Sequence, residues 1–353
     1  MKLVLKWVII TKYYAIRIQK INIVRRKNML SKNKIKITGI LLSAIIMTGC
    51  SYEKAKVSEN KNMKIGVLNV VDSGVLYVAE NENMFKKNGI NVDLVKFSSA
   101  ADQSKAIEGG GVDAILTDPI VQSMVSKGDK KLKEVCIAVG EKPENGKFFV
   151  VASPKTKHNE VKKLEGAKIG ISKGTMMEFL LDSYCELLGV NVDKIEKVNI
   201  PSLSLRAEAL LQNKIDDAVL PESLGELTMA KGAKLVVDDT KLKENLSESI
   251  IAFDSDYINK NKDAMEKFMK SYIEAAKEIN NNPQKYKNII LKESNVPQKL
   301  WSKFSIPYYN TTSVTDKKLF NRVQTWLIRN KLIKKPFIYN DMVDSSFIDK
   351  LKK

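Results

Sequence analysis

Histidine and cysteine are scarce in this sequence, and long apolar runs are missing. The 353 residues include one histidine and three cysteines. A single histidine excludes a metal site built from several histidines. Cys50, Cys136 and Cys185, with no C-x-x-C spacing, argue against a zinc ribbon or a disulfide framework. No run of about 18 apolar residues is present, so we expect no membrane-spanning helix. The missing G-x-x-x-x-G-K-S/T motif excludes a P-loop ATPase.

Acidic residues are absent from the first 49 positions, which explains most of the net charge. The chain holds 59 basic and 41 acidic residues, a formal charge of +18. Eleven of the basic residues lie in residues 1–49, so residues 50–353 carry 48 against 41, or +7. This modest excess, with no basic stripe interleaved with aromatic residues, predicts no nucleic-acid partner.

The end of the basic region has the pattern of an export signal. Ile37–Met47 is an apolar run that follows three lysines and precedes Thr48-Gly49-Cys50. This order is typical of a secretory signal peptide, and a cysteine after Thr-Gly resembles a bacterial lipobox. We predict a signal peptide at residues 29–49, whose removal leaves an acylated Cys50 anchored at the extracytoplasmic face of the membrane. A simple signal peptide with a coincidental cysteine is the alternative.

Residues 1–28 fit no part of such a signal. Met29 would begin a leader of ordinary length, and Arg25-Arg26 is what a translated ribosome-binding site would encode. We therefore expect residues 1–28 to be a non-native upstream extension, with translation beginning at Met29. Residues 50–63 are rich in Ser, Glu, Lys and Asn, and we expect them to form a polar tether.

The body of the chain contains one pattern twice. Lys64-Ile65-Gly66-Val67 recurs as Lys168-Ile169-Gly170-Ile171, 104 residues later, and residues 89–93 recur as 189–193. Residues 113–118 recur as 217–222, again 104 residues later. In each half, short apolar strands alternate with helices, which is typical of parallel βαβ units with right-handed crossovers. We predict two similar α/β lobes.

Two short apolar segments, Val150–Ala152 and Ile250–Phe253, flank the second half. We interpret them as the strands of a two-strand hinge, which carry the chain from lobe one to lobe two and back. Lobe one would comprise residues 64–149 and 254–353, and lobe two residues 150–253. A long amphipathic helix over Lys262–Ile279, ended by an Asn-Pro pair, would help to complete lobe one.

The strand ends supply the candidate ligand contacts. In open α/β sheets, ligands bind at the carboxyl ends of strands, beside helix N-termini. Two hinged lobes would face each other across a cleft that closes on a ligand. The candidates are Asp72, Ser73, Gly74, Ser98, Ser99, Thr117 and Asp118 in lobe one, and Ser172, Lys173, Gly174, Thr175 and Glu222 in lobe two. Capping of the following helix is the competing interpretation of these residues.

Asp118 and Glu222 occupy matching positions of the repeat. Two carboxylates in the cleft would disfavour a bare nitrate- or sulfate-like anion and suit a ligand with N–H or ammonium donors. Lys173 could offset their charge. Arg206 could reach inward, although a solvated or structural ion pair is the favoured interpretation of this residue.

Several short motifs follow one another in a fixed order over roughly residues 64–350. They are Lys64-Ile65-Gly66, residues 89–94, Phe97-Ser98-Ser99, residues 111–114, residues 164–170 and Lys173-Gly174-Thr175. The pattern resembles the substrate-binding lipoproteins of ABC importers in the nitrate/sulfonate/taurine/thiamine-precursor family. Many members carry Trp-Glu-Pro where this chain has Pro221-Glu222-Ser223, a departure that puts an aromatic wall of the pocket in doubt.

The resemblance implies a type II periplasmic binding protein fold, with two Rossmann-like lobes and a ligand cleft between them. It implies a monomer without a cofactor that captures a small-molecule solute and delivers it to an ABC permease and its ATPase. A pyrimidine- or menaquinone-pathway enzyme on the same fold is the alternative. Because the chain has no Ser/His/acid or Cys/His combination, we predict neither catalytic residues nor metal ligands.

Overall fold

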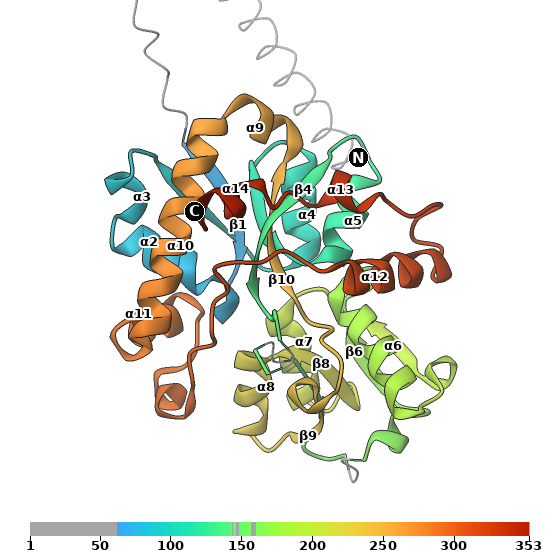
Figure 1. Ribbon diagram of the computed structural model, residues 1–353. Coiled ribbons are helices and arrows are strands. Elements are labelled where there is room, and N and C mark those ends of the chain that lie inside the picture. The colour runs from blue at the N-terminus through green and yellow to red at the C-terminus, as the bar shows by residue number, and fades with distance from the viewer. Residues whose placement is uncertain (1–61, 143, 146–147, 157–159, 353) are drawn as a thin grey trace, which may run out of the picture. The chain divides into compact units, whose positions relative to one another are not determined.

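The computed structural model describes residues 62–352, apart from residues 143, 146–147 and 157–159 (Figure 1). The expected upstream extension, the signal peptide, Cys50 and nearly all of the tether lie outside the described residues. The described residues form two five-stranded sheets. Within this part of the chain, no helix has both the length and the apolar character needed to cross a membrane.

Sheet one has the strand order β2-β1-β3-β10-β4. Its strands are β1 (Met63–Leu68), β2 (Val92–Phe97), β3 (Ala114–Thr117), β4 (Leu132–Val139) and β10 (Ser249–Asp254). β1 pairs in parallel with β2 and β3, whereas β10 pairs antiparallel with β3 and β4. The carboxyl ends of β1, β2 and β3 therefore meet at one edge of this sheet.

Sheet two repeats this topology with the order β7-β6-β8-β5-β9. Its strands are β5 (Phe148–Ala152), β6 (Lys168–Ile171), β7 (Glu196–Asn199), β8 (Asp217–Pro221) and β9 (Lys234–Asp238). β6 pairs in parallel with β7 and β8, and β5 pairs antiparallel with β8 and β9. The shared order and strand directions confirm the two similar α/β lobes predicted from the repeat.

Helices cover both faces of each sheet, because alternate strand residues point to opposite faces. Sheet one packs against α2 (Gly74–Asn81), α10 (Lys262–Asn281) and α11 (Pro283–Glu293) on one face, and against α4 (Ala100–Glu108) and α5 (Pro119–Ser126) on the other. Sheet two packs against α6 (Met176–Leu188) on one face, and against α7 (Leu203–Leu211) and α8 (Glu222–Met229) on the other. The shorter helices are α3 (Met84–Lys87), α9 (Ser255–Lys260), α13 (Tyr339–Met342), α14 (Ser346–Leu351) and the 3-10 helices η1 (Val71–Ser73), η2 (Val161–Leu164), η3 (Val192–Lys194), η4 (Asp239–Lys241) and η5 (Gln298–Lys303).

Capping residues fix where the helices at the strand ends begin. The Ser99 hydroxyl accepts from the backbone N–H of Asp102 at the start of α4, and Thr175 caps α6 in the same way. Pro283 opens α11 directly after α10, as the predicted helix stop at the Asn-Pro pair requires. Local sequence therefore determines where each helix begins after its strand, and the candidate residues lie at these strand–helix junctions.

The chain crosses between the sheets after β4 and returns after β9, in segments that lie outside the two strands predicted to form the hinge. Val150–Ala152 lies inside β5 and Ile250–Phe253 inside β10, each paired on both sides within one sheet. The two crossing segments touch, because the Asn245 side chain donates to the carbonyl oxygens of Gly140 and Glu141. Both strands were predicted correctly as strands, but the crossing itself is made by the segments beside them.

Helix α12 (Lys317–Arg329) packs against both lobes, although residues 254–353 were assigned to lobe one. The Trp326 indole donates to Asp182 of α6 over 2.9 Å and meets the Phe179 ring edge to face. On the other side, Gln324 donates to the Ser123 hydroxyl of α5 over 2.9 Å. The C-terminal segment thus joins the two lobes, as Figure 1 shows where α12 runs between them.

Candidate functional site

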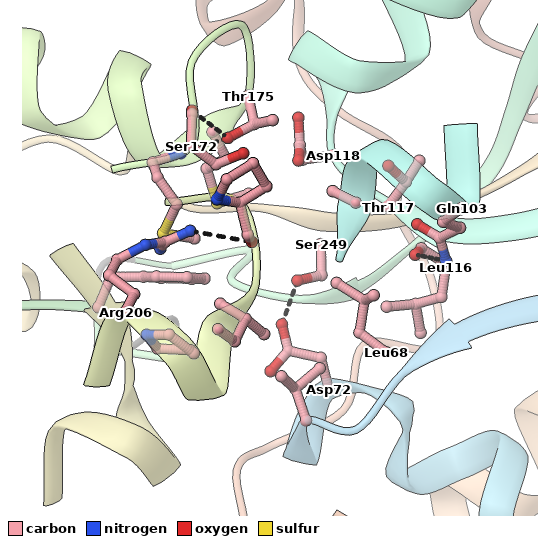
Figure 2. A pocket seen from close by; sticks show the side chains of 18 residues that line it. Leu68, Asp72, Gln103, Leu116, Thr117, Asp118, Ser172, Thr175, Arg206 and Ser249 are labelled. Carbon is pink, nitrogen blue, oxygen red and sulfur yellow. Dashed lines mark hydrogen bonds between the residues drawn. The ribbon is translucent and has the colours of Figure 1, made fainter. Parts of the chain in front are cut away.

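The two lobes hold between them a cavity of about 70 Å³ (Figure 2). Its wall in lobe one comes from η1, α4 and the corner between β3 and α5. Its wall in lobe two comes from the loop between β6 and α6, the start of α7 and the end of β8. At roughly 10–15 Å³ per water, the space holds roughly five to seven water molecules. A compact solute suits it, and a polymer does not.

Asp118 lies where helices from both lobes begin. Its carboxylate accepts from the backbone N–H groups of Ile120 and Val121 over 2.9 and 2.8 Å, which caps α5. It also accepts from the backbone N–H of Met176, the first residue of α6 in lobe two. Burial raises the pKa of Asp118 to about 6, against the lowering effect of these three N–H groups. At neutral pH this residue is a carboxylate shared by the two lobes.

Asp72 is the second carboxylate at the cavity and belongs to η1. Its carboxylate accepts a hydrogen bond from the hydroxyl of Ser249, the first residue of β10. Burial raises the pKa of Asp72, while the bond from Ser249 opposes that shift. Asp72 therefore ties the strand end of lobe one to the end of a crossing segment.

Gln103 of α4 reaches the cavity from inside the helix. Its side chain is fully buried, and its amide nitrogen donates to the carbonyl oxygens of Gly66 and Leu116 over 2.9 and 3.0 Å. Gly66 leaves room for this side chain, because a Cβ there would lie 3.3 Å from the Gln103 Cγ. The side chain thus bridges β1 and β3 directly beneath the cavity.

Arg206 of α7 makes the matching arrangement in lobe two. Its guanidinium donates to the carbonyl oxygens of Ile200, Pro201 and Val219 over 3.0, 3.2 and 3.0 Å. The side chain is fully buried, burial lowers its pKa to about 9, and among the described residues no carboxylate forms an ion pair with it. The favoured expectation of a solvated or ion-paired Arg206 is wrong, because main-chain carbonyls hold it in the cavity wall.

The sequence of this chain matches a known protein family. A family model described as NMT1/THI5 like matches residues 71–286, more than half of the chain. The chain belongs to the NMT1/THI5-like family. A Haemophilus influenzae protein named for thiamine biosynthesis is 25% identical over 177 residues, which are 50% of this chain and 52% of that protein. The chain therefore spans about half the length of that relative.

Solved structures share the fold of this NMT1/THI5-like chain. The ligand-binding component of an ABC-type import system from Staphylococcus aureus, solved with zinc bound, has a TM-score of 0.68 at 16% identity, covering 82% of this chain and 98% of its own. The aliphatic sulphonate-binding protein SsuA of Escherichia coli has a TM-score of 0.64 at 16% identity, covering 78% and 94%. The nitrate-binding protein NrtA of Synechocystis has a TM-score of 0.66 at 12% identity, covering 83% and 88%. The predicted periplasmic binding protein fold is confirmed.

The cavity of this family member brings together five of the twelve predicted ligand contacts: Asp72, Thr117, Asp118, Ser172 and Thr175. The other serines and glycines have local roles. Ser73 donates to the Leu68 carbonyl oxygen, Ser98 and Ser99 bond to the Asp102 carboxylate, Gly74 packs under the Tyr309 ring and Gly174 adopts a left-handed turn with φ of +69°. Lys173 is exposed and is not part of the lining. Helix capping, the competing interpretation, applies to Ser99 in this group.

Glu222 is buried but does not line the cavity. In this region, the offset that relates the paired strands of the two sheets differs by one residue from the offset of the sequence repeat. Ile65 pairs with Ala114, whereas Ile169 pairs with Asp217, so β3 and β8 correspond at an offset of 103 residues. The predicted equivalence of Asp118 and Glu222 at 104 is therefore wrong. Pro221 is the residue that corresponds to Asp118: both occupy the N-cap position of the following helix, but only Asp118 makes a side-chain capping bond.

The same offset relates two lining residues that do not lie at a strand end. Gln103 and Arg206 are 103 residues apart, occupy the same place in α4 and α7, and donate to equivalent carbonyl oxygens on β3 and β8. Gly66 packs against Gln103, and Gly170 packs against Arg206. A Cβ at Gly170 would lie 3.1 Å from the Arg206 Cγ. An alignment of the two halves at 103 residues in this region would have found the pair. Within the described residues, no group of three or more His, Cys, Asp or Glu is placed to hold a metal.

Proposed function

We propose that this protein is the solute-binding component of an ABC importer, which captures a small organic solute and delivers it to a membrane permease and its ATPase. The observation that carries the proposal is the cavity between the lobes, lined by strand-end groups from both sheets. A solute held there contacts both lobes only when they are closed, so closure can report occupancy to a partner. The solved structures with this fold include sulphonate- and nitrate-binding proteins, which supports the proposal.

The polarity of the cavity favours an organic solute over a bare inorganic anion. Asp118 and Asp72 bring two carboxyl groups to the lobe one wall, and Arg206 brings one cationic side chain to the lobe two wall. Carboxylates repel nitrate and sulfate but accept from N–H or ammonium groups. A sulfonate of the taurine type or a thiamine-precursor pyrimidine therefore suits the site, and the relative named for thiamine biosynthesis supports the pyrimidine.

Thermal denaturation in the presence of candidate solutes tests the proposal. The purified protein would be unfolded with taurine, ethanesulfonate, nitrate or 4-amino-5-hydroxymethyl-2-methylpyrimidine. A solute at 100 times its Kd stabilises the folded form by about 2.7 kcal/mol, which raises the melting temperature measurably. The bound solute should be recovered unchanged after incubation. Conversion into a product would favour an enzyme instead, and no stabilisation by any of these solutes would count against the proposal.

The proposal includes a lipid anchor at Cys50 on the extracytoplasmic side of the cell membrane, and a monomeric binding protein. The support is the lipobox-like sequence around that cysteine. Fractionation of cells that express the full chain tests the anchor. The native chain should sediment with membranes, and a Cys50→Ser variant should not; equal membrane association of both would refute the anchor.

A further inference from the structure

The side-chain amide of Gln103 has a fixed orientation. Both hydrogens of its nitrogen are used, because that nitrogen donates to the carbonyl oxygens of Gly66 and Leu116. Rotating the amide by half a turn would place its oxygen against the same two carbonyl oxygens, which can only accept. The chain itself therefore determines that the Gln103 oxygen points away from the strands.

That oxygen has no hydrogen-bond partner within the part of the chain that the structure describes, although Gln103 is fully buried and lines the cavity. In Figure 2 the oxygen lies on the side of the amide that faces Thr117 and Asp118. The buried Thr117 hydroxyl, on the same wall, also lacks a partner among the described residues. Buried polar atoms rarely stay unpaired in native proteins, so this wall is complete only when something in the cavity bonds to it.

The opposite wall has the reverse polarity. Arg206 takes the position in lobe two that Gln103 takes in lobe one, and a guanidinium can only donate hydrogen bonds. Lobe one thus offers an acceptor-only oxygen at the place where lobe two offers N–H groups. A solute that lies between them has its donor end toward α4 and its acceptor end toward α7.

We propose that Gln103 is a specificity-determining residue that selects solutes presenting an N–H or O–H donor to its side-chain oxygen. The inference rests on the proposed function, because it assumes that the cavity binds a solute. It goes further because it names the protein atom that contacts the solute, the Gln103 side-chain oxygen, and the solute group that this atom recognises, an N–H or O–H donor. An analogue without the donor leaves the Gln103 oxygen buried and unpaired, and its affinity should fall about 10- to 100-fold.

Titration calorimetry with matched solutes tests this preference in the native protein. Isethionate and ethanesulfonate have the same charge and differ by one hydroxyl, and taurine carries an ammonium group at that position. 4-Aminopyrimidine and 4-methylpyrimidine form a second matched pair. In whichever series binds, the member with the donor should bind at least tenfold more tightly. Equal affinities within a series that binds would overturn the inference and leave the proposed function standing.

Two glutamine variants separate recognition from stability. Gln122 of α5 is also buried and donates to two main-chain carbonyl oxygens, those of Leu132 and Met342, but does not line the cavity. Gln103→Met and Gln122→Met therefore lose comparable structural bonds. Only Gln103→Met should reduce the donor preference, to within about threefold; the preference should persist in Gln122→Met. A Gln103→Met protein that still prefers the donor tenfold would overturn the inference. If no solute of either series binds the native protein, the proposed function fails and the inference fails with it.

Discussion

Glu248 lies at the end of the second crossing segment, in a cluster of buried acids. Its carboxyl group accepts from the Thr315 hydroxyl over 2.7 Å and from the Asn245 side chain over 3.1 Å. Glu134 of β4 is fully buried beside it and accepts from the backbone N–H of Thr315 over 2.6 Å. Among the described residues no lysine or arginine forms an ion pair with either acid. Burial also raises the pKa of Glu134, to about 7, so the cluster favours protonated carboxyl groups.

We expect a Glu248→Gln variant to resist unfolding better than the native protein as pH rises. Burial, with the negative charges of Glu134, Asp316 and Glu141, raises the pKa of Glu248 from its ordinary value of 4.5 to about 8. The folded state then binds this proton more tightly than the unfolded state, so stability is lost as pH rises from 4.5 to about 8. The slope is about 1.4 kcal/mol per pH unit well below pH 8 and half of that at pH 8, so the advantage of the variant should grow by about 2 kcal/mol between pH 6 and pH 8.

Urea denaturation of both proteins at pH 6, 7 and 8 measures this difference directly. Glu108→Gln, at an exposed position at the end of α4, is the control and should change the free energy of unfolding by less than about 0.5 kcal/mol at every pH. A difference between native and Glu248→Gln protein that stays constant from pH 6 to pH 8 would refute the reasoning. It would mean that Glu248 is already ionised in the folded protein at pH 6.

Three further outcomes follow from contacts described above. Gly140→Ala should destabilise the fold by about 2 kcal/mol or more in thermal denaturation, because φ is +92° and the new Cβ would lie 2.1 Å from the Ser247 carbonyl oxygen; a loss under about 0.5 kcal/mol would contradict this. Trp326→Phe keeps one aromatic ring but loses the pyrrole ring with its N–H and thus the bond to Asp182, so urea denaturation should show a loss of at least about 1–2 kcal/mol; unchanged stability would count against a structural role. The pKa of Asp118 is raised to about 6, so its carboxylate is lost below that pH, and solute affinity should fall about tenfold between pH 7 and pH 5. Asp118→Asn should remove this pH dependence in calorimetry, and its persistence would assign the effect to another group.

The two-lobe fold could be predicted from sequence because the residues that recur in the two halves have the same structural roles. Gly66 and Gly170 recur since each must leave room for a long side chain that crosses the strand, from Gln103 and Arg206 respectively. The apolar runs around them recur because each fills the centre of a sheet covered on both faces. These requirements act over a few neighbouring residues, which is why they are visible in the sequence.

The candidate site was predictable only where local rules place the side chain. Asp118 and Thr175 sit at helix starts after strands, and the general rule for open sheets found both. The prediction for Glu222 failed because similar residues recur at an offset of 104, whereas the pairing of β3 and β8 with their neighbouring strands relates the two sheets at an offset of 103. A shift of one residue is enough to move a side chain to the other face of a strand. Gln103 and Arg206 project from inside helices, where no strand-end rule applies. The two-sided packing of α12 depends on contacts with α5 and α6, far away in the sequence.

The carboxylate of Asp118 also has a consequence for affinity. Its bond from the Met176 N–H joins the lobes without any help from solute. Such a contact exists only in the closed arrangement, so it shifts the balance of open and closed molecules in empty protein. A larger closed fraction lowers the apparent dissociation constant and also lets unoccupied protein resemble the loaded form. Under the proposed function, a permease would therefore need to sense more than closure to distinguish the loaded from the unoccupied protein.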